Sequence, residues 1–391
     1  MREVSDPSLT SRIRRYGVFN ANGCFNCGGC TISCELTDGN ATFPRQVMQA
    51  GLLGLNDSVR QSFGPWICHD CGDCSDVCPR EAKPRESLAT LRRYLVAEYD
   101  WTGLAGRICG SRAWEMAALS IASGLVLALI ILYHLYVGKV DSTTLRTTAM
   151  GMEHMFPRIT YFTVAVFLLP LFFLVTNAIR MFVFTMRRGP NREIGLKFYL
   201  AQAKTLLVEA ITQKEFLKCP AKLEKRKWII HWFLAFGFTL LFVIKLFFLR
   251  WFQTDKIYAF YHPQRWLGYL GFACLVAAAS EFLFERYRNR PPFRQQSVFG
   301  DWMVPAMLIL TAVSGLGVHL LRYAGFGLSA HYCYAAHLMV AVPLLAVELP
   351  FGKSSHMLYR PLALYFDAVR KMASRETDAR DNQTVEKGAA A

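Results

Sequence analysis

The pattern of apolar and polar positions changes near residue 110. Residues 1 to about 108 mix the two kinds, whereas six long apolar stretches follow, each close to the roughly 20 residues with which a helix spans a bilayer. The clearest of them reads AALSIASGLVLALIILYHLYV. The pattern predicts a mainly α protein with six transmembrane helices, over about 113–137, 159–184, 228–251, 266–284, 301–323 and 331–350.

The basic residues between these stretches predict their orientation. Lys and Arg together number eleven in 185–227, four in 285–300 and seven after residue 350, but three in 138–158, two in 252–265 and none in 324–330. By the positive-inside rule the first set of loops faces the cytoplasm, which places both termini there. The formal net charge of +15 is then explained by topology, without any nucleic acid as a partner.

We therefore expect three parts in a multi-pass protein of the cytoplasmic (inner) membrane. Residues 1–108 form a cytoplasmic domain, 109–356 a transmembrane domain with a cytoplasmic insert at 185–227, and 357–391 a cytoplasmic C-terminal tail. The N-terminus shows no apolar region typical of a secretory signal, so the first domain is expected to keep its thiols reduced.

Two cysteine runs of identical spacing lie in that first domain: CFNCGGCTISC from Cys24 and CHDCGDCSDVCP from Cys68. In two-cluster ferredoxins such a run gives three thiolates to one cubane and its fourth to the other. Zinc sites use paired Cys-x2-Cys motifs, which this spacing fits badly. We expect two [4Fe-4S] clusters, cluster 1 on Cys24, Cys27, Cys30 and Cys78, and cluster 2 on Cys68, Cys71, Cys74 and Cys34.

The segments around the runs favour helices. TFPRQVMQAGLLGL has Pro44 in a position suited to a first helical turn, and KPRESLATLRRYLVAEY has Pro84 in the same role. Residues of roughly 15–100 thus resemble the small iron–sulfur subunit of heterodisulfide reductase and the helical cluster domain of succinate dehydrogenase. The resemblance implies an α-helical domain with two [4Fe-4S] clusters.

Histidines at matching depth on different helices are the usual ligands of haem b within a bundle. His231 and His356 lie at the cytoplasmic ends of the third and sixth stretches and form one expected pair. His337 precedes His356 by 19 residues, which is about 28 Å of helix. A second haem at the outer level is therefore expected, held by His337 with either His134 or His319.

The stretch HLMVAVPLLAVELPFGKSSHMLYRP is similar to the last helix of the haem b subunit of respiratory nitrate reductase. The matching positions are His337, Pro350, Phe351, Lys353, His356 and Pro361. On this mapping His231 is the inner ligand of the family's second helix. The family's outer ligand falls about ten residues later, where this chain has Leu241, so that His134 or His319 would replace it.

Both halves together resemble the membrane subunits of the quinone-interacting membrane-bound oxidoreductase (Qmo) family. The resemblance implies haem b, menaquinone or menaquinol as substrate, and two cytoplasmic flavoprotein partners of the heterodisulfide reductase A-like type. It also implies adenylylsulfate reductase as a redox partner in dissimilatory sulfur metabolism. The chain would be the quinone-reactive electron-transfer subunit of an oxidoreductase, with no catalytic residue assigned.

Two other functions fit the same motifs. One is an equivalent electron conduit for a heterodisulfide reductase-like or sulfite reductase-linked complex. The other is a haem-free membrane anchor for a ferredoxin module. Ionisable residues within the stretches bear on quinone chemistry, which needs a proton acceptor. We expect Glu281 and Glu348 to pair with arginines and Lys245 to extend to the membrane surface.

Overall fold

The computed structural model describes residues 3–37, 42–138, 142–147, 152–187, 194–218, 222–248, 251, 254–288 and 297–389. Within these ranges helices are the only regular secondary structure, which confirms the predicted mainly α fold. The chain divides into two compact units. Unit 1 comprises Met1–Gly106, Val175–Lys225 and Ser355–Ala391, and unit 2 comprises Arg107–Leu174 and Arg226–Ser354. The three-part division expected from the sequence stays a prediction.

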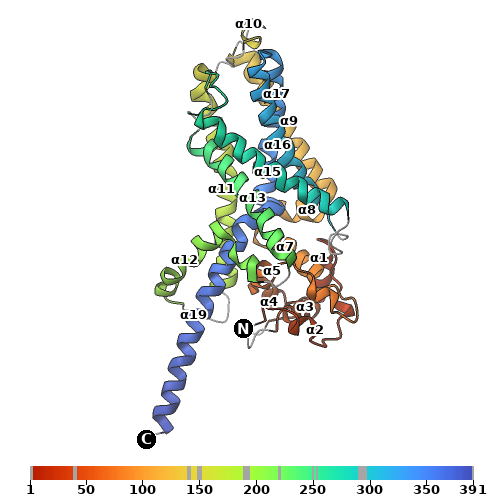
Figure 1. The fold of residues 1–391 in the computed structure, drawn as a ribbon. Coiled ribbons are helices and arrows are strands. Elements are labelled where there is room, and N and C mark those ends of the chain that lie inside the picture. The colour runs from red at the N-terminus through yellow and green to blue at the C-terminus, as the bar shows by residue number, and fades with distance from the viewer. Residues whose placement is uncertain are drawn as a thin grey trace. The chain divides into compact units, whose positions relative to one another are not determined.

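Among the residues that the structure describes, six helices are long and apolar enough to cross a membrane, and each overlaps one stretch predicted from the sequence (Figure 1). They are Arg112–Tyr136, Tyr161–Arg187, Lys225–Phe247, Pro263–Tyr287, Phe299–Tyr323 and Gly327–Phe351. The number and positions of the apolar spans are therefore confirmed.

Unit 2 is a bundle built from these spans. Its main helices are α9 (Arg112–Leu132), the first part of α11 (Met152–Phe182), α13 (Lys222–Phe247), α15 (Pro263–Tyr287), α16 (Phe299–Tyr323) and α17 (Gly327–Pro343). Shorter pieces are the π-helical η2 (Tyr133–Gly138) and η6 (Leu344–Glu348), α10 (Ser142–Leu145), α18 (Leu349–Phe351) and the 3-10 turn η7 (Lys353–Ser355). In Figure 1, α9, α16 and α17 run alongside one another, and α15 packs on α16.

Apolar side chains and small residues hold this bundle together. Leu119, Leu275, Met307 and Leu344 form a buried core from four elements. A Cβ atom at Gly237 of α13 would lie 2.8 Å from the backbone nitrogen of Leu275 in α15. Close helix contact at small residues is a usual device of membrane bundles.

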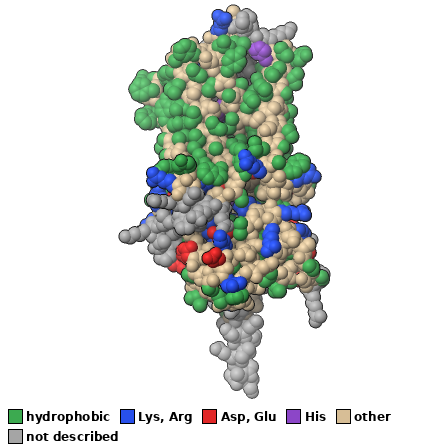
Figure 2. All heavy atoms as spheres, turned by 90° about the vertical axis from the view of Figure 1, so that its right-hand side faces the viewer, with side chains coloured by type: hydrophobic (Ala, Val, Ile, Leu, Met, Phe, Trp, Pro, Cys, Tyr) green, Lys and Arg blue, Asp and Glu red, His purple; other side chains and the backbone are tan. Residues whose placement is uncertain are grey.

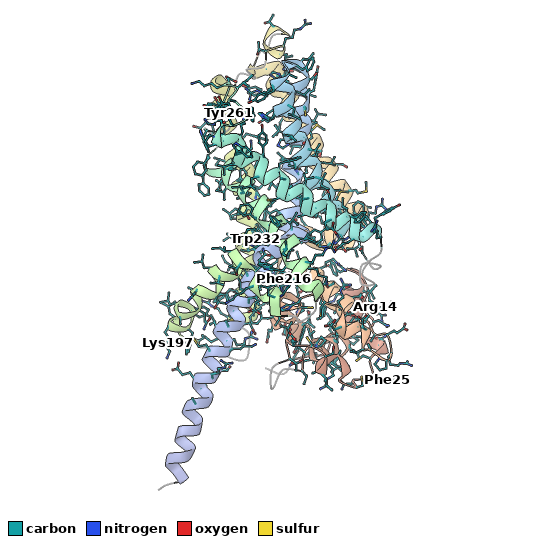
Figure 3. All side chains as sticks on the ribbon, viewed as in Figure 1. Arg14, Phe25, Lys197, Phe216, Trp232 and Tyr261 are labelled. Atoms are coloured by element: carbon teal, nitrogen blue, oxygen red, sulfur yellow. The ribbon has the colours of Figure 1, made fainter. Side chains whose placement is uncertain are left out.

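The outer surface of unit 2 is apolar. Ile121, Leu168 and Phe247 are 71%, 56% and 72% exposed, and Figure 2 shows hydrophobic side chains over the presented face of the unit 2 helices. Such a surface suits lipid and would be unfavourable in water. Aromatic residues lie toward both ends of the unit, as Trp232 and Tyr261 show in Figure 3, and they fit a pair of interfacial belts.

Unit 1 joins three segments of the chain. The first contributes α1 (Leu9–Arg14), η1 (Ala21–Gly23), α2 (Gly29–Ile32), α3 (Arg45–Leu52), α4 (Asn56–Gln61), α5 (Gly64–Ile67), α6 (Asp73–Asp76) and α7 (Pro84–Tyr99), and α8 (Leu104–Gly110) follows at its end. The other two contribute the end of α11, the π-helical η3 (Val183–Arg187), α12 (Leu196–Thr212), η4 (Lys214–Lys218) and α19 (His356–Ala389).

Aromatic rings join these segments in the core of unit 1. Trp66 of α5, Tyr99 of α7 and Tyr359 of α19 are each at most 1% exposed. The ring centroids of Trp66 and Tyr359 lie 5.1 Å apart, and those of Tyr99 and Tyr359 lie 5.6 Å apart. The start of α19 is thus part of the same core as the helices around the second cysteine run.

Candidate metal centres

The two cysteine runs adopt the same backbone conformation. Asn26 and Asp70, each two residues after the first cysteine of its run, have φ angles of 59° and 62°. Gly28 and Gly72 follow the second cysteines, with φ angles of 85° and 108°. Each of these glycines precedes a one-turn helix, α2 or α6. The repeated spacing in the sequence thus produces a repeated loop in the structure.

Hydrogen-bond donors point at the cysteine sulfurs in both loops. The backbone N–H of Asn26 donates to Cys24 Sγ over 3.4 Å, and that of Asp70 donates to Cys68 Sγ over 3.4 Å. The Ala82 N–H donates to Cys78 Sγ over 3.3 Å. Donors of this kind stabilise thiolates that hold a metal cluster and tune its potential.

The folding of the loops brings cysteines from the two runs together. Cys24, Cys27, Cys30 and Cys78 line one cavity, although Cys78 belongs to the second run. Cys34 of the first run interacts electrostatically with Cys68 and Cys71 of the second. Helices α2 and α6 are in contact. Among the described residues, no three metal-ligating side chains lie close enough to hold a single ion.

Burial distinguishes the two sets of thiols. Cys68 and Cys74 are buried, whereas Cys27 is exposed. Burial raises the pKa of Cys34 to about 11 and raises the pKa of Cys68 and Cys74 above the ordinary thiol value. These thiols would therefore stay neutral at pH 7 without a metal, and a bound metal would displace their protons.

The second loop is surrounded by arginines that no sequence motif marks. Arg85 binds Asp70 through two hydrogen bonds of 2.8 and 2.9 Å. Arg92 and Arg360 both donate to the backbone carbonyl of Cys68, over 2.6 and 3.0 Å. Burial and the neighbouring Arg92 lower the pKa of Arg360 to about 10. The one signal in the sequence is that Arg360 lies one helical turn after His356.

Substitution of Gly28 tests the loop geometry. We expect Gly28→Ala to lower the midpoint of thermal cluster loss by several degrees, because a left-handed φ costs an L residue about 1–2 kcal/mol. Gly29→Ala is the matched control, since a Cβ there meets only ordinary contacts, 3.7 Å from the Val77 oxygen and 3.8 Å from Cys27 Sγ. Visible absorbance during heating measures both, and equal midpoints would contradict the prediction.

Unit 2 contains a cavity of about 320 Å³ between α13, α15, α16 and α17. His319 of α16 and His337 of α17 both line it, and we refer to it as the His319–His337 cavity. Its walls are largely apolar, with Phe238, Phe272 and Leu344 among them. Three cationic side chains also line it: Lys245, Arg265 and Arg322. Lys245, which was expected to extend to the membrane surface, lies against this cavity instead.

Hydrogen bonds orient both histidines. His337 Nδ1 lies 3.0 Å from Ser314 Oγ and 3.0 Å from the Thr311 carbonyl, and His319 Nε2 lies 2.7 Å from the Tyr269 hydroxyl. A bond at Nδ1 of His337 leaves its Nε2 available to a metal. A Cβ at Gly315 would lie only 3.2 Å from His337 Cε1, so the glycine makes room for the ring.

The remaining predicted haem ligands lie elsewhere. His134 lies in the π-helical η2 and does not line the His319–His337 cavity. His231 belongs to α13 in unit 2, with its ring 6.5 Å from that of Phe282, whereas His356 begins α19 in unit 1. The pairing of His231 with His356 therefore stays a prediction.

Of the two glutamates expected to pair with arginines, one does. Glu281 forms an ion pair with Arg226, which also binds Glu285 over 3.1 Å. Glu348 is only 1% exposed and interacts instead with the carboxyl group of Glu115, itself 6% exposed. The expectation for Glu348 was wrong, because no arginine of the described residues forms an ion pair with this buried side chain of η6.

Comparison with known proteins bears on the segment that contains the cysteine loops. Residues 16–79 match the family described as the 4Fe-4S dicluster domain. A heterodisulfide reductase C-like protein of Archaeoglobus profundus is 32% identical over 94 residues. Residues 16–79 thus match a 4Fe-4S dicluster domain, and part of the chain is similar to heterodisulfide reductase C-like proteins. The C 2 iron–sulfur subunit of the CoB–CoM heterodisulfide reductase of Methanocaldococcus jannaschii is 40% identical to the chain over 75 residues.

The similarity to these relatives extends over a minor part of the chain. The matches cover 24% and 19% of this chain, and 50% and 40% of the two relatives. The chain thus spans half or less of the length of these curated relatives. No solved structure matches the chain. The comparisons therefore show a 4Fe-4S dicluster domain at residues 16–79, and the assignment of unit 2 depends on its own residues.

Proposed function

We propose that the chain is the membrane electron-transfer subunit that relays electrons between the menaquinone pool and cytoplasmic flavoproteins. One observation carries the proposal: a dicluster domain and a His-lined cavity among six apolar spans occur in one chain. The domain suits one-electron transfer, and the spans give access to a lipid-soluble reductant. The basic loops support a cytoplasmic location for both termini.

The proposed ligands of cluster 1 are Cys24, Cys27, Cys30 and Cys78, and those of cluster 2 are Cys68, Cys71, Cys74 and Cys34. The cavity lined by the first four thiols and the electrostatic contact of Cys34 with the second run support this crossed assignment. The donors to Cys24, Cys68 and Cys78 would stabilise the charge of the bound thiolates. When bound, such clusters carry one electron at a time.

The proposed haem b ligands of the outer site are His337 and His319. They line one apolar cavity, where Lys245, Arg265 and Arg322 would neutralise the two propionates of the porphyrin. The shared cavity favours His319 over His134 as the partner of His337, and binding through Nε2 of His319 would replace its hydrogen bond with the Tyr269 hydroxyl. His231 and His356 remain the proposed ligands of an inner haem. Haem iron in such a site exchanges single electrons, while the histidines fix its position and the apolar walls exclude water.

The partners follow from the resemblance to the Qmo family. We propose two flavoprotein partners of the heterodisulfide reductase A-like type, with adenylylsulfate reductase downstream. A second candidate is a conduit for a heterodisulfide reductase-like complex, which is favoured by the names of the curated relatives. Affinity purification of the tagged chain from its native membrane separates the two, because the co-purifying soluble enzyme differs.

Cofactor content tests the proposal directly. Anaerobically purified protein is expected to contain about eight non-haem iron atoms and about eight sulfides per chain, together with haem b. The haem bands should become reduced when a menaquinol analogue is added. Protein with full iron but no haem b would contradict the proposal in favour of a haem-free anchor.

A further inference from the structure

Two guanidinium groups meet at the second cysteine loop. Arg92 Nη2 and Arg360 Nη1 donate to the same acceptor, the backbone carbonyl oxygen of Cys68, over 2.6 and 3.0 Å. Two positively charged groups that share one acceptor atom lie close together and repel each other. One neutral carbonyl group does not offset this repulsion, so the arrangement calls for negative charge close by.

Neither arginine forms an ion pair with a carboxylate of the described residues. Arg92 donates its remaining hydrogen bond to the Pro65 carbonyl. Nη2 of Arg360 is shielded from solvent and has no hydrogen-bond partner among the residues that the structure describes. The ring of Phe216, labelled in Figure 3, covers this guanidinium at 4.0 Å. A cation held away from water without a counter-charge is strongly unfavourable.

The carboxylates near Arg92 and Arg360 do not provide the missing counter-charge. Asp70 is engaged by Arg85 in a bidentate ion pair. Glu209 of α12 is buried and acts electrostatically on Arg360, but it forms no ion pair with it, and its Oε2 accepts from the Glu215 N–H over 3.3 Å. Glu209 and Asp70 thus act on Arg360 only at longer range, without an ion pair.

An iron–sulfur cluster would supply the missing charge. An oxidised cubane with four thiolates has a net charge of about −2, and reduction adds one electron. We propose that Arg92 and Arg360 are the counter-charges of cluster 2 and raise its reduction potential. This inference rests on the proposed function. Both cations favour the reduced cluster over the oxidised one, because the reduced form carries more negative charge.

The first loop lacks an equivalent pair among the residues that the structure describes. Arg45 donates to the Asn26 carbonyl over 3.3 Å, and Arg80 is exposed and lies over the ring of Phe25. Solvent screens such charges more strongly than buried ones. The two clusters are therefore tuned separately, and cluster 2 depends on an arginine that lies one turn after His356, on the helix proposed to hold the inner haem.

Redox titration of the full-length protein followed by electron paramagnetic resonance tests the inference. The signal of cluster 2 is identified as the one that Cys74→Ser removes. We expect Arg360→Gln and Arg92→Gln each to lower the potential of cluster 2 and to leave that of cluster 1 unchanged. Arg360→Lys keeps the charge and should restore most of the shift. Arg45→Gln, the matched control in the first loop, should leave cluster 2 at its wild-type potential.

The other possible results of the arginine variants also decide for or against the inference. If Arg360→Gln loses cluster 2 while Arg360→Lys retains it, the requirement for a cation is supported by iron content instead of potential. Full iron and a wild-type cluster 2 potential in both glutamine variants would overturn the inference and leave the proposed function standing. Wild-type protein without either cluster signal would overturn both.

Discussion

Cys78→Ser is expected to remove the same cluster as Cys24→Ser, although the two cysteines belong to different runs. Non-haem iron should fall from about eight to about four atoms per chain in each variant. The reason is that Cys78 lines the cavity of the first-run thiols, and a serine hydroxyl is a much poorer ligand for iron than a thiolate. Cys109→Ser, outside both runs, is the control and should retain full iron.

Double variants make this prediction sharper. Cys24→Ser combined with Cys78→Ser should retain about four iron atoms, because both changes affect one cluster. Cys24→Ser combined with Cys34→Ser should lose nearly all iron, because the two changes affect different clusters. The opposite result, with Cys24 and Cys34 behaving as ligands of one cluster, would show that each run holds its own cluster and that the crossed assignment is wrong.

His319→Ala and His337→Ala are expected each to remove one haem, so that haem b falls from about two to about one per chain. Both imidazoles line the same cavity, and a six-coordinate haem needs both. The double variant should lose no more than either single variant. Pyridine haemochrome quantification of purified protein, normalised to cluster iron, measures all three.

His134→Ala is the matched control for this experiment, because His134 is an equal candidate on sequence grounds and does not line the cavity. It should retain the wild-type haem content. Loss of haem in His134→Ala with full content in His319→Ala would reverse the assignment. His231→Ala should remove the other haem, leaving a spectrum distinct from that of His337→Ala.

The elements most visible in the sequence are those with strong periodic signals. The six spans follow from apolar length alone, and the cysteine loops follow from a spacing that only certain cofactors require. The choice between His134 and His319 does not follow, because both lie late in a span at similar depth. They differ because His319 lines the cavity with His337 and His134 does not, a tertiary arrangement that the hydropathy pattern does not encode.

The positions of the arginines around Cys68 could not be predicted from sequence patterns either. Arg92 precedes another arginine on α7, and Arg360 lies in a segment that reads as the start of a tail. Their convergence is a tertiary effect, produced when Tyr359 packs between Trp66 and Tyr99 and brings its neighbour Arg360 to the loop. The environment of Glu348 escapes the sequence for a similar reason, since it is set by a contact of η6 with Glu115 of α9.

The aromatic core of unit 1 bears on how this protein can be dissected. A fragment that ends near residue 108 would keep all eight cluster cysteines. It would lack Tyr359, however, so that the rings of Trp66 and Tyr99 would each expose an apolar face to water. A soluble version suited to spectroscopy would need residues 355–373 grafted back, because Val369 and Ala373 are buried there as well. Unit 1, which contains the cysteine loops, is thus assembled from segments that are distant in the sequence, and residues 1–108 alone do not complete its core.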